Sequence, residues 1–281
     1  MNIKQTIVEE VLSALEADKL DLPVLPDMTR KVRHLICDPD SSTGQFVKLI
    51  STDLAISLYI IKAANSAAYA GIRPVANLHD AIPRLGYRLL YSMVMDITLS
   101  KLFTAKNPLI NRKLKELWER SRTVAATSYV LAQKRNYLKP DDAILAGLVH
   151  EIGALPLYLY ADRHHSQISA EVLDGLIQKF SPTVGVKLLQ SWNFPDELVD
   201  VISGNTNQTC IVPFGIADYV DVVIVADLLV QSRTKPINWR NIRSAEALGC
   251  YAKDCENFLT TYAEQLAEVN DLLGIGHAQA A

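Results

Sequence analysis

The chain has 281 residues, of which 49% are hydrophobic and 21% are charged, so it can fill one large or two moderate globular cores. Its formal net charge of -3 supplies no strongly basic surface for non-specific nucleic-acid binding. The most apolar stretches, 144–160 and 219–230, are short and contain acids, so neither is expected to span a membrane. The sequence opens without a secretory signal pattern and its four cysteines lack CxxC spacing, which predicts a cytoplasmic protein with structural or incidental thiols.

The pattern of apolar residues predicts an all-α fold, because they recur every three or four positions and short alternating runs of β-branched residues are almost absent. In the N-terminal half we expect helices over residues 2–18, 23–38, 42–51, 53–67, 77–85 and 86–104. In the remainder we expect a longer helix over about 110–135 and further helices over 141–161, 164–178, 181–191, 195–203, 215–232 and 241–273. A polar stretch over 104–111 separates the two groups, so we place a soft boundary between an N-terminal helical part, 1–107, and a helical core, 108–281.

One stretch, AGLVHEIGALPL over residues 146–157, places His150 and Glu151 side by side in an otherwise almost entirely apolar segment. Helical geometry puts Arg120 at the edge of the apolar face of the long helix. The same geometry puts Asp227 on the apolar stripe of the 215–232 helix, unlike Asp221. An ionised carboxylate is costly to bury alone, so Glu151 and Asp227 each require a cation, a proton or a dense set of donors. A positive group is therefore expected between them.

Three features each have a structural interpretation that competes with a functional one. Asn65 and Ser66 lie among small residues, where polar side chains can bond backbone groups or contact a ligand. The long helix carries a basic run from Arg112 to Arg122 that is interrupted by glutamates, which is typical of a solvated helix face. His150 by itself is typical of a satisfied core histidine, with metal ligation as the alternative.

Several motifs, in order along the chain, resemble the HDOD domain, the HD-related output domain of bacterial signalling proteins. They are LPVLPDM (22–28), LISTDLAISLYIIKAANSAAYAG (49–71), LHDAIPRLG (78–86), AGLVHEIGALPL (146–157), VGVKLLQSWNFPDELVDVI (184–202) and VIVADLLV (223–230). The resemblance covers roughly residues 20 to 232. It implies an all-helical bundle with an N-terminal helical subdomain and a degenerate copy of the HD phosphohydrolase core.

The resemblance also assigns positions to a metal site. Catalytic relatives bind a divalent metal through a first His, a His-Asp pair and a later Asp. Here the first His falls at Arg120, the pair at His150 and Glu151, and the last acid at Asp227. An arginine cannot lose its proton to bind a metal and would repel a divalent ion. We therefore expect the Arg120 guanidinium to stand where the metal charge would be, with no metal, no cofactor and no confidently assigned catalytic residue.

Histidines found in many relatives are also missing here. By the spacing of the flanking motifs, they would fall at Ser181 and at Gly204 or Asn205. These substitutions favour a bacterial signal-transduction protein that binds signalling protein partners, or a nucleotide-type ligand, without catalysis. The alternative is a metal-dependent phosphohydrolase, an HD-superfamily phosphodiesterase, and only this alternative requires a divalent metal cofactor. A purely structural interaction module is the third hypothesis.

Overall fold

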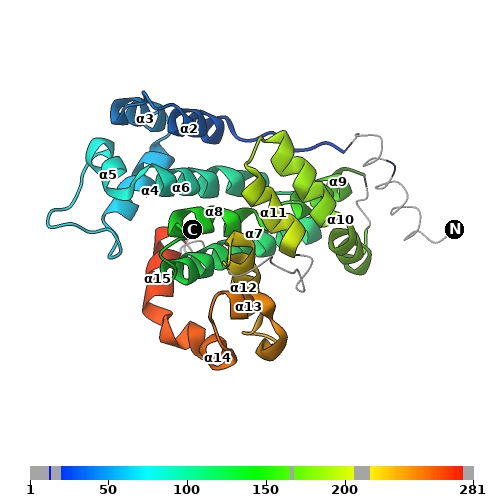
Figure 1. The fold of residues 1–281 in the computed structure, drawn as a ribbon. Helices are drawn as coiled ribbons and strands as arrows, with labels where there is room; N and C mark the ends of the chain where they lie inside the picture. The colour runs from blue at the N-terminus through cyan, green and yellow to red at the C-terminus, as the bar shows by residue number, and fades with distance from the viewer. Residues whose placement is uncertain (1–12, 14–19, 165–167, 206–215, 275–281) are drawn as a thin grey trace.

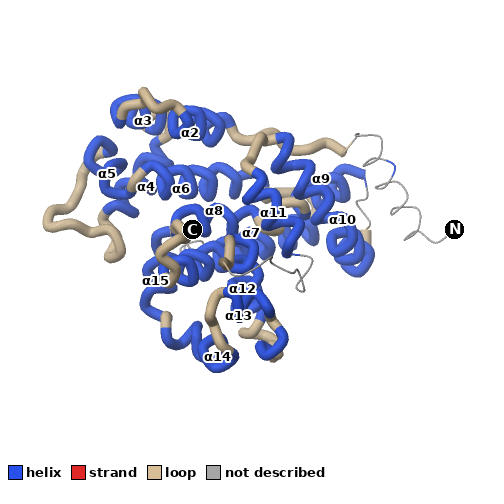
Figure 2. The backbone as a smooth tube through the Cα atoms, viewed as in Figure 1, coloured by secondary structure: helices blue, strands red, loops and turns tan. Residues whose placement is uncertain are grey.

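Every regular secondary-structure element among the described residues, 13, 20–164, 168–205 and 216–274, is a helix in the computed structural model, and loops and turns connect these helices (Figures 1 and 2). The predicted all-α fold is therefore confirmed for this part of the chain. The helix expected over 2–18 lies outside the described residues, apart from Ser13, which is helical.

The N-terminal helices lie together at one side of the molecule (Figure 1). They are α2 (Asp27–Cys37), α3 (Thr43–Ile50), α4 (Leu54–Ala64), α5 (Leu78–Leu85) and α6 (Tyr87–Leu99), followed by the 3₁₀ helix η1 (Ser100–Leu102). Side chains fix two of the helix starts, since Asp53 accepts a hydrogen bond from Ile56 N at 3.1 Å and Asn77 accepts one from Asp80 N at 2.9 Å. α2 packs against α6, whose side chains are almost all buried. The helices expected over 23–38, 42–51, 53–67, 77–85 and 86–104 are each found at slightly shorter length.

The centre of the molecule is the long helix α7 (Pro108–Gln133), which packs against α8 (Pro140–Val149) and α12 (Tyr219–Gln231). The α7 helix begins inside the polar stretch that we expected to separate the two halves. Asn107 accepts a hydrogen bond from Leu109 N at 2.9 Å, and Pro108 is suited to the first helical position because that position needs no N–H donor. A Cβ on Gly147 would overlap the backbone of Ala125, so the glycine allows α7 and α8 to cross closely.

Helix boundaries differ from the expectation at three places. The expected helix over 141–161 is divided by a turn at 150–153 into α8 and α9 (Ala154–His164), and the expected helices over 164–178 and 181–191 are one helix, α10 (Ala170–Ser191). A proline interior to a helix costs about 3 kcal/mol, but α10 passes through Pro182 because its buried face continues on both sides of it. The expected helix over 241–273 is three helices, α13 (Arg243–Ala247), α14 (Ala252–Thr261) and α15 (Ala263–Leu272).

The turn between α8 and α9 is shaped by a glycine. A Cβ on Gly153 would collide with the backbone of Ser181 and Gly185, so only glycine lets the turn press against α10 at this point. Helix α11 (Asp196–Asn205) then packs against α10 and α12. The 3₁₀ helix η2 (Trp239–Asn241) connects this group to the C-terminal helices.

The start of α12 corrects one expectation about an acid. Asp221, expected to point outward, is only 1% exposed, and it accepts a hydrogen bond from Asp218 N at 3.3 Å that closes the cap of the helix. Burial raises the pKa of the Asp221 carboxyl, an effect that hydrogen bonding to Ser244 and to the Asp218 backbone partly offsets. Ile216, which lies inside the helix expected over 215–232, is exposed and precedes α12.

Among the described residues, one stretch, Pro140–His164, is long and apolar enough to cross a membrane by length and composition. Its most apolar window is 83% buried inside the protein, as in the core helix of a globular domain. The division into 1–107 and 108–281 stays a prediction, and α6 of the first part packs directly on α8 of the second.

Candidate functional site

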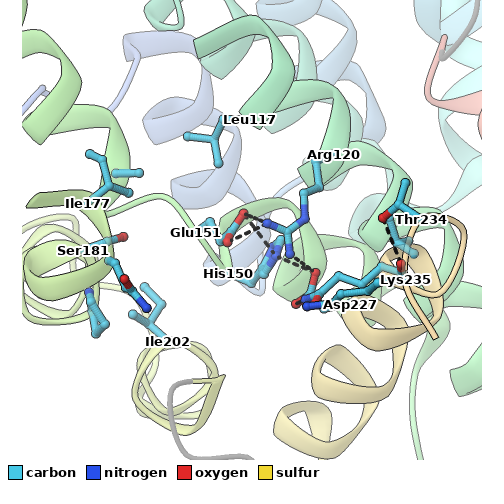
Figure 3. A pocket seen from close by; sticks show the side chains of 15 residues that line it. Leu117, Arg120, His150, Glu151, Ile177, Ser181, Ile202, Asp227, Thr234 and Lys235 are labelled. Carbon is cyan, nitrogen blue, oxygen red and sulfur yellow. Dashed lines mark hydrogen bonds and ion pairs between the residues drawn. The ribbon is translucent and has the colours of Figure 1, made fainter. Parts of the chain in front are cut away.

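Four side chains that are far apart in the sequence meet beside the turn after α8 (Figure 3). Arg120 extends from α7, His150 and Glu151 belong to the turn, and Asp227 extends from α12. Arg120 Nη1 donates hydrogen bonds to both carboxylate oxygens of Glu151, at 3.0 and 3.1 Å, while its Nη2 donates to Asp227 Oδ1. The guanidinium therefore bridges the two carboxylates, in the position where a positive group was expected.

His150 forms the floor of this cluster. Its Nδ1 lies 2.7 Å from the carbonyl oxygen of Gly147, and because a carbonyl can only accept, Nδ1 carries the proton. The other ring nitrogen, Nε2, lies 3.8 Å from Glu151 Oε2 and 3.9 Å from Asp227 Oδ1. Nε2 is buried and has no hydrogen-bond partner within the described part of the chain. The imidazole thus points toward the two acids without bonding either.

The electrostatics of the cluster are set by one cation facing two carboxylates. Burial lowers the pKa of the Arg120 guanidinium, but attraction to Glu151 and Asp227 outweighs burial and raises it above its ordinary value. The side chain of Asp227 is 9% exposed and that of Arg120 is 34% exposed. Asp227 Oδ2 also accepts a hydrogen bond from Gln231 Nε2 at 2.6 Å. Both the buried Asp227 carboxylate and the partly exposed Glu151 carboxylate are therefore satisfied by protein donors.

A cavity of about 700 Å³ opens beside the cluster. Its far wall includes Ile177, Ser181 and Ile202, which face the acids and Arg120 across the opening (Figure 3). Thr234 and Lys235 stand at the side of Asp227. Ser181 lies in the wall without contacting the cluster, and its neutral hydroxyl is a weaker metal ligand than the histidine that the resemblance implied at this position.

The other position of a missing histidine lies near the far end of α11. A Cβ on Gly204 would collide with the side chain of Val220, so this position is closed to a larger residue unless α12 moves. The side chain of Asn205 lies outside the described residues.

The residues present do not fit the divalent metal that HD phosphohydrolases use. A metal site needs several deprotonated or neutral donors around one point, whereas here a permanent cation is bonded to both candidate acids. Among the described residues, no group of three His, Cys, Asp or Glu side chains is placed to hold a metal ion. At the positions where relatives would hold a metal, this chain therefore has an arginine bonded to two carboxylates. No catalytic step through a metal follows from this arrangement.

The candidates Asn65 and Ser66 lie elsewhere and bond the backbone. Asn65 Nδ2 donates to Val75 O at 2.8 Å, and its Oδ1 accepts from Val75 N at 2.8 Å, which ties together the ends of the loop that follows α4. Ser66 Oγ donates to Ala63 O at 2.7 Å. Neither residue lines the cavity beside Arg120. Their contacts are those of residues that hold a loop in place.

Sequence reasoning missed two contributors to the site and misassigned a neighbouring arginine. Gln231 follows Asp227 by four residues on one helix, a spacing that brings side chains together and could have identified it. Gly147 supplies the carbonyl that orients His150. Arg122, expected on a solvated face, is buried, and its Nε lies 2.9 Å from Asp96 Oδ1.

The Asp96 carboxyl is almost completely enclosed between α6 and α7. Burial raises its pKa to about 6, although Arg122 and a hydrogen bond from Tyr59 both act to lower it. This pair does not line the cavity beside Arg120. It belongs to the packing between the N-terminal helices and α7.

Comparison with known proteins agrees with the architecture. A crystal structure of a candidate metal-dependent phosphohydrolase from Shewanella amazonensis SB2B is 26% identical, covers 97% of this chain and all of the other, and superposes with a TM-score of 0.81. An HDOD domain protein of unknown function from Geobacter sulfurreducens is 24% identical, with 96% and 98% of the two chains covered and a TM-score of 0.71. The similarity to the Geobacter protein shows that the two chains share a fold.

An uncharacterized protein from Treponema pallidum (strain Nichols) is 24% identical over an alignment of 208 residues, and the alignment covers 70% of this chain. The chain spans only 40% of the length of that relative. The model of the HDOD domain matches residues 22–208, about two thirds of the sequence, and includes the His150–Glu151 turn and Arg120. This chain belongs to the HDOD domain family.

Proposed function

We propose that this protein is a non-catalytic HDOD regulator that acts by binding signalling protein partners or a small ligand in the bacterial cytoplasm. The observation that supports this proposal is the Arg120 guanidinium, which is bonded at once to Glu151 and Asp227. A hydrolase of the HD type needs a metal at this point to acidify a water molecule. An arginine supplies charge to the two acids but presents no open coordination position and no acidified water.

The alternative, a metal-dependent phosphohydrolase, is favoured by one feature of His150. With Nδ1 bonded to Gly147 O, a neutral imidazole presents the lone pair of Nε2 toward Glu151 and Asp227. A backbone carbonyl that accepts a hydrogen bond from one ring nitrogen orients metal-binding histidines in the same way. His150 thus keeps the orientation of a metal ligand, while the Arg120 guanidinium occupies the position that the metal would take.

The cavity beside the cluster is the site that we propose for a nucleotide-type ligand. Its volume of about 700 Å³ lies in the range of small-molecule pockets. Lys235 stands at its margin with Gln178 and Gln231, so a cation and amide groups are available to an anionic, hydrogen-bonding ligand. Such a ligand would reach the cluster from the solvent side without displacing Arg120.

Metal analysis of the purified full chain, followed by a phosphodiesterase assay with manganese or nickel, tests the proposal. The expected result is far less than one ion per chain and no turnover of bis(p-nitrophenyl) phosphate above the level of a Glu151→Gln variant. The double variant Arg120→His, Glu151→Asp, which restores the metal-binding residue types, serves as the matched comparison and is expected to bind more metal than the wild type. Stoichiometric metal with turnover in the wild type would establish the phosphohydrolase alternative instead.

Ligand binding is tested separately by thermal shift with a panel of mononucleotides and cyclic dinucleotides. A ligand of the cavity is expected to raise the melting temperature of the wild type and to lose most of this effect in Lys235→Ala. Exposed Lys253, outside this cavity, provides the control variant Lys253→Ala, which should keep the full shift. An equal loss in both variants would remove the cavity beside Arg120 as the binding site.

A further inference from the structure

Two thiols meet at the start of α14, far along the chain from the cluster around Arg120. Tyr251 is the N-cap of this helix, so Cys250 immediately precedes the cap and Cys255 is the fourth helical residue. Side chains at these two positions pack on each other in the hydrophobic staple, a common feature of helix starts. Here Cys255 Sγ lies 3.6 Å from the carbonyl oxygen of Cys250. Local helix geometry therefore holds the two cysteines next to each other.

The surroundings of Cys250 favour a thiolate. Arg135 Nη2 lies 3.9 Å from Cys250 Sγ. Both residues line a second cavity, of about 510 Å³, which is also lined by Lys134 and Lys253. The free N–H groups at the start of a helix add positive potential. A hydrogen bond from the Cys255 thiol lowers the pKa of Cys250, and Arg135 acts in the same direction, while burial opposes both.

The two thiols differ in accessibility as well as in charge. Cys250 is half-buried and lines the cavity, whereas Cys255 is 3% exposed and keeps its proton, because its bond to Cys250 and burial raise its pKa. One thiol is thus suited to meet a reagent from solvent, and the other is suited to react with the first. Cys37 is exposed and lines a different cavity with Arg33 and Arg88, but the lining of that cavity contains no second cysteine to act as a resolving thiol. Cys210 lies outside the described residues.

We propose that Cys250 and Cys255 form an oxidation site for hydroperoxides, in which Cys250 is the attacking thiol and Cys255 is the resolving thiol. The Cys250 thiolate attacks one oxygen of the O–O bond, which breaks and releases the alcohol after it takes up a proton. The Cys255 sulfur then attacks Cys250 Sγ, so an S–S bond forms, the S–O bond breaks, and the Cys255 proton leaves with the hydroxide as water. The two thiols lose two electrons, and the hydroperoxide is reduced to one alcohol and one water.

The disulfide would replace a noncovalent staple with a covalent one at the start of α14. It would also remove the negative charge that Arg135, near the end of α7, contacts at Cys250. The helices that follow, α14 and α15, pack against α12 and α7, which carry Asp227 and Arg120. Oxidation would therefore change the start of the C-terminal helical segment that packs against α7 and α12.

Peptide mapping of the full chain after treatment with tert-butyl hydroperoxide tests the inference. Trypsin cleaves after Lys253, between the two cysteines, so their disulfide joins two peptides that are separate when the protein is reduced. We expect these joined peptides from the wild type and from the control Cys37→Ser, Cys210→Ser. In Cys255→Ser we expect a sulfenic acid at Cys250, trapped by dimedone, in place of the disulfide.

The contribution of Arg135 is measured in the same assay. At pH 6, below the Cys250 pKa of about 7, Arg135→Gln should slow the oxidation of Cys250 by up to about tenfold, the change that one pKa unit makes in the thiolate fraction at that pH. Lys134→Gln, which alters a cation placed over the Tyr262 ring, should slow it far less. Oxidation of Cys37 before Cys250, or a reduced and unmodified Cys250 after treatment that oxidises free cysteine, would overturn the inference.

Discussion

Two arginines of α7, only two residues apart, meet acids in opposite surroundings. Arg122 is sealed between α6 and α7, where its side chain is 11% exposed and that of Asp96 is 4% exposed. Arg120 bonds Glu151 and Asp227 at the edge of a cavity, with its side chain 34% exposed. Both neutralise buried acids, but only Arg120 can be reached by a ligand. This difference in exposure assigns Arg122 to the packing between helices and Arg120 to the candidate functional site.

The largest effect is expected at the sealed pair. Replacing Arg122 with methionine leaves the Asp96 charge buried without its cation, which costs about 3–5 kcal/mol of the free energy of unfolding. Urea denaturation monitored by circular dichroism provides the measurement. Arg112→Met is the control, because Arg112 and Glu116 form an exposed pair whose loss costs less than about 1 kcal/mol.

The double variant Arg122→Met, Asp96→Leu sharpens this test. With both charges removed, no ion remains buried, so much of the loss seen in Arg122→Met should be recovered. A double variant less stable than Arg122→Met would mean that packing of the arginine side chain, and not its charge, stabilises the contact between α6 and α7.

The pH dependence of the sealed pair has a defined sign. Because burial raises the folded pKa of Asp96 from 3.8 to about 6, the folded state binds this proton more tightly than the unfolded state. The stabilisation is complete below about pH 4 and is lost as the pH rises through about 6. The free energy of unfolding of the wild type, minus that of Asp96→Asn, should therefore increase by about 2–3 kcal/mol from pH 7.5 to pH 4. A difference that stays constant or decreases would show that Arg122 keeps the carboxyl ionised.

A smaller effect is expected at the open cluster. Arg120→Met removes charged hydrogen bonds, but Glu151 and the cavity are partly solvated, so we expect a loss of about 1–2 kcal/mol. The same urea experiment measures it, with Arg112→Met again as the control. A loss as large as that of Arg122→Met would contradict the distinction between the two arginines.

The sequence predicted the helical fold and the positions of the cluster better than it predicted helix boundaries and burial. The apolar period identified most helices, and the paired charges required a cation near Glu151 and Asp227. The turn at 150–153 was missed because it depends on contact between Gly153 and the backbone of α10, which no local pattern contains. Arg122 was misplaced because its partner, Asp96, lies on another helix. Both errors concern contacts between segments distant in sequence.

The most direct test of the central claim, that Arg120 occupies the position of a divalent metal, is crystallography of the wild type soaked in manganese chloride, with data collected at the manganese absorption edge. The account predicts guanidinium density between Glu151 and Asp227 and no anomalous peak there. An anomalous peak within bonding distance of His150 Nε2 and the two carboxylates, with Arg120 turned away, would contradict it.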